Sequence, residues 1–388
     1  MQVLEPDSDR EPMDSRNGTL GCLMCPWKTP CGGWSRRGGG WSCLDYCCGS
    51  PGDCDRTCPK NVRGLAADLI DVERFDLEGL GPLENSALVL PRSIPVWLHG
   101  SHRTPVGLDW AAVPLESLLR MDGPGAQLID DDAAGLRRRL GLTEGTRLLL
   151  RGTGEDRALE HYWYSHREGR LAQRLARLGF SAAIPPNYSH WYQTSPLEHM
   201  KNRRRTALVA DSWAEAGIPV IPYIAGIRSA DWDDWLGFLR DRPGVTLIAK
   251  EFGTGLRIAD RANEVASALH WLQGELGRQL HLVVMAGGRH RELIGSVFGE
   301  RVTFLDTNPF MWAQKRRVAV VSTDGRLRTR RASPDAEVAA LLQVNADTTV
   351  RHHSATTVEP ALARGHVDPT LWWGACESCG DAERPCSC

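Results

Sequence analysis

Residues 281–316 read HLVVMAGGRHRELIGSVFGERVTFLDTNPFMWAQKR, and the fold prediction starts from this stretch. Its first five residues, His281–Met285, form an apolar run of the length that a buried parallel strand requires. The Gly-Gly pair at 287–288 allows a sharp turn out of that strand, and a short helical segment follows. A second apolar run, residues 302–305, ends at Asp306. A carboxylate at the carboxyl end of a parallel strand lies where α/β sheets and barrels place their chemistry.

The same unit repeats upstream, because apolar runs alternate with helical segments from residue 146 onward. This alternation indicates an α/β fold with parallel strands, and we predict a (β/α)₈ TIM-barrel-like domain. No Gly-x-Gly-x-x-Gly follows the first strand, which argues against a dinucleotide fold. The predicted strands are 147–151, 181–184, 220–224, 245–250, 281–285 and 302–305, with weaker candidates at 87–90, 96–99 and 106–113. The predicted helices are 131–140, 159–178, 196–216, 231–240, 260–276 and 334–342, and 317–330 is predicted to be a hairpin.

The composition changes along the chain and predicts four parts. Residues 1–20 are expected to be a disordered leader, and residues 21–60 a Cys-rich metal-binding module. A segment without apolar periodicity cannot form a hydrophobic core and needs metal ions or other cross-links to fold. The barrel-like domain is expected over residues 61–330. A C-terminal helix and a Cys-rich tail are expected over residues 331–388.

The overall charge excludes a strong attraction of the whole molecule to nucleic acid or to an anionic membrane, since 46 basic side chains face 48 acidic ones. Five of the basic residues are Lys, so the other 41 are Arg. No apolar stretch approaches the roughly 20 residues of a membrane span, and the polar N-terminus lacks the core of a signal peptide. We therefore predict a cytoplasmic protein.

All 12 cysteines lie near the two ends of the chain, and none occurs between residues 59 and 375. Cysteines that fill a core would be scattered, and cytosolic thiols stay reduced, so the segregation favours metal ligands. The front group comprises Cys22, Cys25, Cys31, Cys43, Cys47, Cys48, Cys54 and Cys58, and the terminal group comprises Cys376, Cys379, Cys386 and Cys388.

Two kinds of metal centre fit the front group. Zinc takes four ligands, often as two C-x₂₋₄-C pairs, which Cys22 with Cys25 and Cys54 with Cys58 would supply. An iron–sulfur cluster takes four cysteines at looser spacing, and the run from Cys54 to Cys58-Pro59 is similar to the end of ferredoxin-type ligation. We favour an iron–sulfur cluster, with zinc as the alternative and free thiols in a flexible leader as the interpretation without a metal. The ligands of the cluster would be Cys43, Cys47 or Cys48, Cys54 and Cys58, with a second metal at Cys22, Cys25 and Cys31. For the terminal group three interpretations stay open. It would hold a zinc ion of its own, complete a metal site with the front group, or be an unstructured terminus without a metal.

Several short motifs carry a resemblance to a known family. They are PPNYS at 185–189, NRRR at 202–205, Trp213 followed by AGIPVIP at 216–222, Ala249-Lys250, and MAGG at 285–288. Together they resemble a bacterial and phage family known as domain of unknown function 4417, over roughly residues 85–325. That family has an acid after the proline, where this chain has Asn187, so the resemblance implies no acid–base role at this position. The family name implies no activity.

A more distant likeness is to the barrel of tRNA-guanine transglycosylases and their DNA-modifying relatives. Those proteins have a strand with a glycine turn, a helix, and a strand that ends in a nucleophilic aspartate. The corresponding parts here are residues 284–288 and the run that ends at Asp306, with Arg316 and Arg317 downstream. The likeness implies base exchange with Asp306 as the nucleophile. The zinc site of that family is also Cys-rich and C-terminal, but the tail of this chain does not reproduce its spacing.

Residues just past the strand ends of a barrel converge on one mouth, and this rule selects the candidate site. Asp306 would act as a nucleophile or stabilise an oxocarbenium-like centre, and the alternative is an Asx-type cap for the turn at Asn308. Lys250 and Glu251 are adjacent, so their side chains point to opposite sides of the strand. Lys250 would bind a phosphate, act as a base with a lowered pKa, or form a peripheral salt bridge. The predicted catalytic residues are Asp306, Lys250 and Glu251. The predicted substrate-binding residues are Arg151, Asn187, Tyr188, Tyr223 and Asn308.

Three basic runs, residues 201–205, 314–317 and 326–331, would line a phosphate track or form solvated faces. Tyr188 with Trp191 and Tyr192 would stack a base. We therefore predict an enzyme that acts on a nucleotide or nucleic acid, with transglycosylase-like base exchange as the specific reaction. The alternatives are a non-catalytic DNA- or protein-binding module of a mobile element, and an iron–sulfur redox protein.

Overall fold

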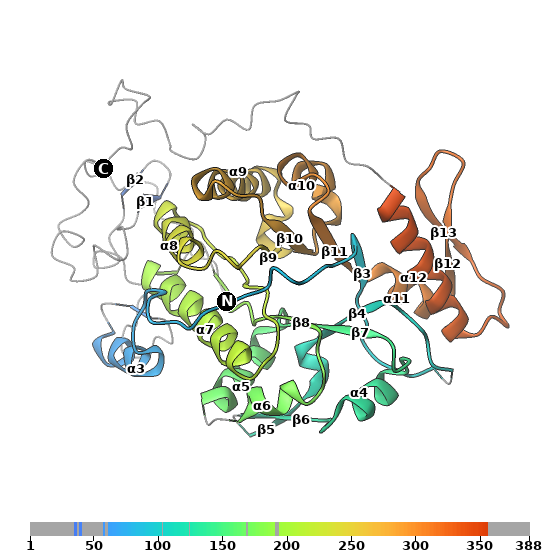
Figure 1. Cartoon of the computed structure of the whole chain (residues 1–388), viewed down its shortest axis with the longest axis horizontal. Helices are drawn as coiled ribbons and strands as arrows, with labels where there is room; N and C mark the ends of the chain where they lie inside the picture. Colours follow the sequence, from blue (N-terminus) through green and yellow to red (C-terminus); the bar gives the residue numbers. More distant parts are fainter. Residues whose placement is uncertain are drawn as a thin grey trace.

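Two parallel sheets form the centre of the structure (Figure 1). It is a computed structural model that describes residues 35–36, 39–40, 57–58, 61–102, 104–123, 125–167, 170–190 and 194–355. The strands of the sheets are β3 (Ser93–Pro95), β4 (Trp110–Pro114), β7 (Arg147–Arg151), β8 (Ala182–Ile184), β9 (Leu247–Glu251), β10 (His281–Met285) and β11 (Val302–Asp306). One sheet has the order β3-β11-β10-β9 and the other β4-β7-β8, and all neighbouring strands in them are parallel. The predicted α/β fold with parallel strands is confirmed.

Isolated parallel bridges link the two sheets. Just beyond β3, Val96 is bridged to Ala112 of β4. On the other side of the sheets, Ala183 of β8 is bridged to Val220, and Tyr223 is bridged to Ala249 of β9. The segment 218–224 therefore lies between β8 and β9.

This segment was predicted as a strand over residues 220–224, and the structure reduces it to bridges. Pro219 and Pro222 have no backbone N–H, so a full ladder of hydrogen bonds cannot form. Their carbonyl oxygens still accept hydrogen bonds, from Ala183 N at 2.8 Å and from Ala249 N at 2.9 Å. The segment thus keeps its place beside both neighbouring strands.

Side chains along the strands alternate between two apolar clusters. In β9, Ile248 belongs to the larger cluster, which also contains the helix residues, and Ala249 belongs to the smaller one. We call the smaller one the inner cluster. It draws on all seven strands of the two sheets and on the segment 218–224. Its buried members are Ile94, Val96, Trp110, Ala112, Leu149, Ala182, Ile184, Ile221, Tyr223, Ala225, Leu247, Ala249, Val283, Met285 and Leu305.

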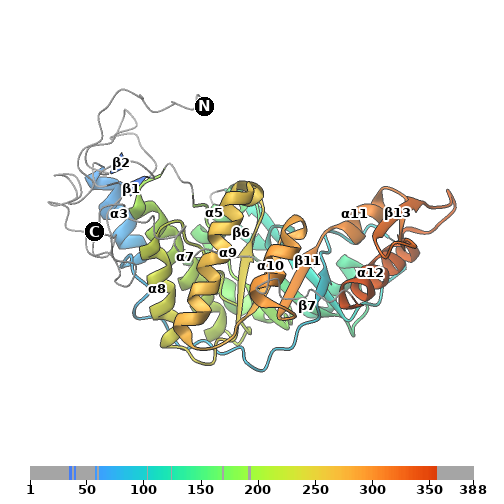
Figure 2. The same ribbon diagram turned by 90° about the horizontal axis from the view of Figure 1, so that it is seen from above.

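Helices lie outside the strands, and α9 packs beside both α8 and α10 (Figures 1 and 2). The described helices are α3 (Val62–Val72), α4 (Ala133–Leu140), α5 (Asp156–Arg167), α6 (Leu171–Ala176), α7 (Pro196–Glu215), α8 (Ser229–Arg240), α9 (Ala259–Leu276), α10 (Arg291–Phe298), α11 (Asn308–Gln314) and α12 (Val338–Ala355), with 3-10 turns η1 (Leu115–Leu118), η2 (Thr254–Arg257) and η3 (Gly288–His290). The two-stranded antiparallel pairs are β1 (Ser35–Arg36) with β2 (Gly39–Gly40), β5 (Leu119–Asp122) with β6 (Gly125–Leu128), and β12 (Arg317–Val321) with β13 (Leu327–Arg331). No helix in these ranges is both long enough and apolar enough to cross a membrane.

Several further predicted elements differ from the structure. The helix expected over residues 334–342 is α12, which spans Val338–Ala355, and the strand expected over residues 106–113 is β4, which spans Trp110–Pro114. The single helix expected over residues 159–178 is two helices, α5 and α6, because Arg170 has a φ of 88°, which an α-helix cannot continue through. The strand expected over residues 87–90 is wrong, since Leu88 N donates to Asn85 O at 3.0 Å and closes a turn instead. The side chain of Asn85 links this turn to the segment 218–224 and to β9, because it donates to Val220 O and to Leu247 O.

Candidate functional site

Four predicted site residues meet at the carboxyl ends of neighbouring parallel segments. Arg151 ends β7, Asn187 follows β8, Tyr223 lies in the segment 218–224, and Glu251 ends β9. Asn187 Nδ2 donates a hydrogen bond of 2.7 Å to Glu251 Oε2. Glu251 also acts electrostatically on Arg151 and on Tyr223. We call these four residues the strand-end cluster.

A fifth residue, Glu116, adds a second carboxylate to this cluster. It lies in η1, directly after β4, and acts electrostatically on Arg151. Its Oε2 accepts a hydrogen bond of 3.2 Å from Glu155 N. Glu116 was not among the predicted site residues, although its position two residues past Pro114, at a strand end, was a usable signal.

Two buried polar atoms of the strand-end cluster have no hydrogen-bond partner within the residues described. They are Arg151 Nε and Asn187 Oδ1. A buried polar atom without a partner costs about 1–3 kcal/mol, so such atoms are normally met by water or by a ligand. The cluster therefore has the unsatisfied donor and acceptor that a polar ligand would use.

Burial shifts the pKa values of Arg151 and Tyr223. It is the largest influence on Arg151 and lowers the pKa of its guanidinium, while Glu116 and Glu251 act in the opposite direction. Arg stays charged in either case, and its fork geometry suits phosphates and carboxylates. Burial likewise raises the pKa of the Tyr223 phenol, with Glu251 acting in the same direction. Tyr223 is therefore a protonated donor at neutral pH.

A close contact between two strand ends fixes the spacing of the cluster. Gly152 N donates to Ile184 O at 2.8 Å, so the chain just past β7 lies against the end of β8. A Cβ at Gly152 would lie 2.4 Å from the Pro185 backbone carbonyl carbon. Only glycine fits there, and Arg151 and Asn187 are positioned from the two sides of this contact.

Lys250 leaves β9 on the side opposite to Glu251, as adjacent residues of a strand must. It is 6% exposed, and its Nζ lies 5.6 Å from the centre of the Tyr223 ring. Burial lowers the pKa of Lys250 to about 8, with Glu251 and Asp231 acting to raise it. Lys250 is therefore close to the strand-end cluster but enters it from the other side of the strand.

Asp306 lies apart from this cluster. Leu305 belongs to the inner cluster and Phe304 to the larger cluster that contains the helix residues, so the alternation places Asp306 on the Phe304 side. Arg291 covers the Phe304 ring at 4.0 Å and acts electrostatically on Asp306. Asp306 Oδ1 accepts a hydrogen bond of 2.9 Å from Asn308 N, which is the capping arrangement considered in the sequence analysis. Burial raises the pKa of Asp306, and Asn308 and Arg291 oppose that shift.

Tyr188, the residue after Asn187, packs its side chain against α5 and α7. It is 2% exposed, and the guanidinium of Arg205 lies 3.8 Å from its ring centre. Its ring meets that of Trp163 edge to face at 5.9 Å. Trp191 and Tyr192, its predicted stacking partners, lie outside the described residues.

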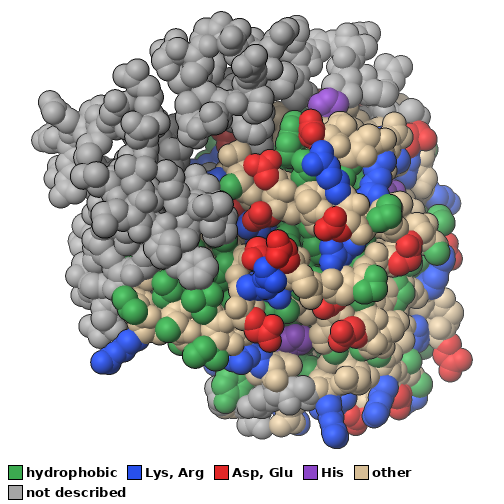
Figure 3. Space-filling model, turned by 60° about the vertical axis from the view of Figure 1, so that its left-hand side comes forward, with side chains coloured by type: hydrophobic (Ala, Val, Ile, Leu, Met, Phe, Trp, Pro, Cys, Tyr) green, Lys and Arg blue, Asp and Glu red, His purple; other side chains and the backbone are tan. Residues whose placement is uncertain are grey.

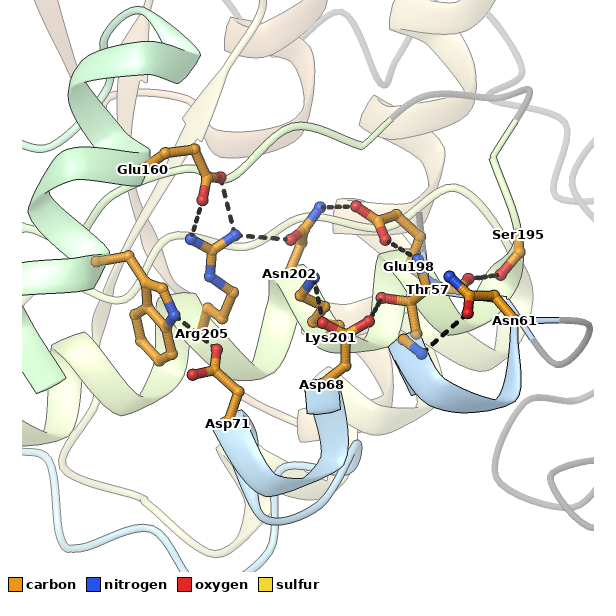
Figure 4. Close-up of polar contacts among 12 residues, drawn as sticks. Thr57, Asn61, Asp68, Asp71, Glu160, Ser195, Glu198, Lys201, Asn202 and Arg205 are labelled. Atoms are coloured by element: carbon orange, nitrogen blue, oxygen red, sulfur yellow. Dashed lines mark hydrogen bonds and ion pairs between the residues drawn. The ribbon is translucent and has the colours of Figure 1, made fainter. Parts of the chain in front are cut away.

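The basic run of α7 is not a surface track, which corrects both interpretations of it. Arg203, Arg204 and Arg205 are each at most 3% exposed. Lys201 forms an ion pair of 2.7 Å with Asp68 of α3. Figure 4 shows this pair, together with the contacts of Arg205 to Glu160 and Asn202. These charges are used inside the protein.

The most buried of these contacts joins α7 to α8. Arg203 Nη1 lies 2.6 Å from Asp231 Oδ1, and both side chains have no exposed surface. Arg203 also pairs with Asp234, and Arg228 Nη2 lies 2.7 Å from Asp231 Oδ1. The two arginines hold the pKa of Asp231 well below its usual range, although burial alone would raise it.

The basic residues around the β12–β13 hairpin are exposed. In the ladder, Arg317 is paired with Arg331, which places two like charges opposite each other. No ion pair of Arg316, Arg317, Arg330 or Arg331 occurs among the residues the structure covers. We call these four residues the hairpin arginines. Elsewhere the surface is mixed, and Figure 3 shows both signs of charge interspersed over the described part of the side that carries α3.

Of the 12 cysteines only Cys58 falls within the described residues, and it is half-buried. The predicted ligands Cys22, Cys25, Cys31, Cys43, Cys47, Cys48, Cys54, Cys376, Cys379, Cys386 and Cys388 lie outside them. Thr57, the neighbour of Cys58, is anchored: its N donates to Glu198 Oε2 at 2.7 Å, and its hydroxyl donates to Asp68 Oδ2 at 2.6 Å (Figure 4). Thr57 is thereby fixed to α7 and α3.

Comparison with known proteins adds no identification. No protein-family model matches this chain, and no curated protein matches it either.

Proposed function

We propose that the protein is an enzyme whose reaction centre is the strand-end cluster. The observation that carries this proposal is the convergence of Arg151, Asn187, Tyr223 and Glu251, with two buried polar atoms left for a ligand. Convergent polar groups at the carboxyl ends of parallel strands are the common place for catalysis in α/β folds. Glu251 takes the role of the central carboxylate in this proposal, because Asp306 accepts a hydrogen bond from Asn308 and is influenced electrostatically by Arg291 instead.

We also propose that the two sheets close into a (β/α)₈ barrel around the inner cluster. The bridges at Val96, Val220 and Tyr223 support closure, because they join the edges of the sheets. The inner cluster supports it as well, since it takes members from all seven strands and from the segment 218–224. The distant likeness to the transglycosylase barrel would imply the same closure.

The proposed substrate is a nucleotide or a nucleic acid. Arg151 is a half-buried guanidinium at the centre. The hairpin arginines are exposed and follow β11 after a single short helix, α11. An Arg opposite an Arg in a ladder is destabilising unless an anion lies between them, and phosphate meets that need. In base exchange, Glu251 would stabilise the electron-poor sugar carbon and Tyr223 would donate a proton.

Fluorescence anisotropy with labelled single-stranded and duplex oligonucleotides tests the substrate class. For the Arg330→Ala/Arg331→Ala double variant we expect weaker binding to all sequences and a salt slope smaller by about 1–2. Glu251→Gln should leave the affinity within about threefold, because it removes no phosphate contact. Absence of binding by the unchanged protein at about 50 mM salt would contradict the proposed substrate.

Arg151→Met separates an enzyme from a non-catalytic binding module. If nucleotide binding is lost while oligonucleotide binding is kept, the centre binds its own ligand and the enzyme proposal gains support. If neither changes, the strand-end cluster is not used, and the DNA-binding module becomes the better description.

The cysteines remain the basis for a metal proposal. An iron–sulfur cluster, or alternatively zinc, held by the front group would stabilise a segment that has little apolar periodicity. The anchoring of Thr57 favours an ordered role for the end of that segment. Metal analysis and visible absorption of anaerobically purified protein distinguish a coloured iron–sulfur protein from a colourless zinc protein.

A further inference from the structure

Lys250 differs from the other lysines that the structure describes. Lys201 forms an ion pair with Asp68, and Lys315 is exposed. Lys250 is buried at the end of β9, and no hydrogen bond or ion pair to its Nζ occurs among the described residues. A buried amine without an acid partner is held less strongly in its protonated form.

The charged and titratable groups around Lys250 come from four elements. Glu251 is its neighbour on β9, Tyr223 belongs to the segment 218–224, Asp231 lies in α8, and His190 follows β8. Asp231 is already bound by two arginines of its own. Burial lowers the pKa of His190 to about 3, so this ring is neutral beside the amine. None of these groups holds the ammonium in a close ion pair.

We propose that Lys250 is an amine nucleophile that forms an imine with an aldehyde or ketone carrying a phosphate or carboxylate. The position supports this, since the amine lies 5.6 Å from the ring centre of Tyr223, which belongs to the strand-end cluster. Arg151 of that cluster supplies a guanidinium for the anionic group of the substrate. Desolvated lysines beside polar clusters are the usual source of such nucleophiles. The inference rests on the proposed function only for the location of the site, and not on a nucleic-acid substrate.

The step needs no oxidant or further reactant. The lone pair of the unprotonated Nζ attacks the carbonyl carbon, a C–N bond forms, and the C–O π pair moves to oxygen, which takes up a proton. The hydroxyl then takes a second proton and leaves as water, while nitrogen loses its protons and the C=N bond forms. Tyr223, which burial keeps protonated, is a proton donor in this cluster.

Reductive trapping with pyridoxal 5′-phosphate tests the proposal on the full chain. The aldehyde probe is added between pH 6.5 and 10, sodium borohydride reduces any imine to a stable secondary amine, and peptide mass spectrometry locates it. Only five lysines have to be distinguished. At pH 8, where Lys250 with a pKa of about 8 is half deprotonated, we expect its initial rate of labelling to be at least about tenfold that of exposed Lys315. Inorganic phosphate should slow labelling at Lys250 and not at Lys315.

Two matched variants control the experiment. Lys250→Arg keeps the charge, cannot form an imine and should lose the fast labelling, and Lys315→Arg should keep it. Mapping on the unchanged protein needs no variant, so a folding defect in Lys250→Arg leaves the result readable. Labelling confined to Lys315 and other sites, or labelling of Lys250 only after unfolding in urea, would overturn the proposal. If the unchanged protein binds no oligonucleotide but its Lys250 is still trapped as an imine, the proposed substrate is wrong and the inference about Lys250 holds.

Discussion

Asn187 Nδ2 lies 2.7 Å from Glu251 Oε2, and this bond spans two segments that are not neighbours. Asn187 follows β8 and Glu251 ends β9, while the segment 218–224 runs between these strands. The bond therefore ties the strand ends together across an intervening segment that proline prevents from forming a full ladder. It also orients Glu251, the carboxylate that acts electrostatically on both Arg151 and Tyr223.

Replacing Asn187 by Leu should destabilise the protein by about 1–3 kcal/mol, because Glu251 Oε2 loses its donor in a partly buried place. Urea unfolding monitored by tryptophan fluorescence gives the free energy of unfolding. Asn263→Leu in α9 is the matched control, since Asn263 is exposed, and it should change stability by less than about 0.5 kcal/mol. If both variants change the free energy of unfolding equally, the hydrogen bond between Asn187 and Glu251 contributes no net stability.

Replacing Gly152 by Ala should cost about 1–3 kcal/mol, because the new methyl group would meet the Pro185 backbone at 2.4 Å and push the ends of β7 and β8 apart. Gly145→Ala is the control, since nothing lies within 4 Å of its added Cβ. Ligand binding at Arg151 should weaken in the first variant alone. An unchanged urea midpoint for Gly152→Ala would contradict the close contact.

Replacing Arg203 by Met should destabilise the protein by about 3–5 kcal/mol, because Asp231 then remains buried with only Arg228 opposite it. The loss should shrink in acid, where Asp231 can be protonated in the variant. Arg330→Met, on the exposed hairpin, is expected to have little effect on urea unfolding. A small loss in Arg203→Met at neutral pH would mean that the ion pair is not desolvated.

Replacing Lys250 by Met should stabilise the protein at pH 7 by about 1–3 kcal/mol. The pKa of Lys250 is about 8 in the folded protein and about 10.5 in the unfolded chain, so the unfolded state binds the proton more tightly. Protonated Lys250 therefore opposes folding below pH 8, and this cost fades as the pH rises toward about 10.5. The gain from Met should fade over the same interval. Lys315→Met should show no gain, and a destabilised Lys250→Met would reveal a close partner for the ammonium.

The sequence predicted the strands best where apolar runs are continuous. The run at Arg147–Arg151 and the helix start at Pro196 match the structure, because burial on both faces and a Ser-Pro cap leave local signals. The segment 218–224 was only half predicted, since its apolar pattern is that of a strand but its prolines limit the pairing.

The site was predicted less evenly. Arg151 and Glu251 were found by their place at strand ends. Asp306 also ends a strand, but it lies on the other face, where Arg291 acts on it electrostatically. The α7 arginines were misread because charge in a sequence does not show whether an acid of another helix, such as Asp231, will meet it. Contacts of that kind are formed only in the folded chain.

Arg203, Arg204 and Arg205 follow one another on α7 and reach three different parts of the protein. Arg203 reaches α8, Arg204 donates to Glu78 O beyond α3 at 2.7 Å, and Arg205 reaches Glu160 of α5. Successive residues of an α-helix point about 100° apart, which is why three neighbours can serve three directions. A one-residue insertion or deletion ahead of them in α7 would turn all three away from their partners at once. Length variation in this chain should therefore be tolerated in its turns, such as that at Gly325, and eliminated from this helix.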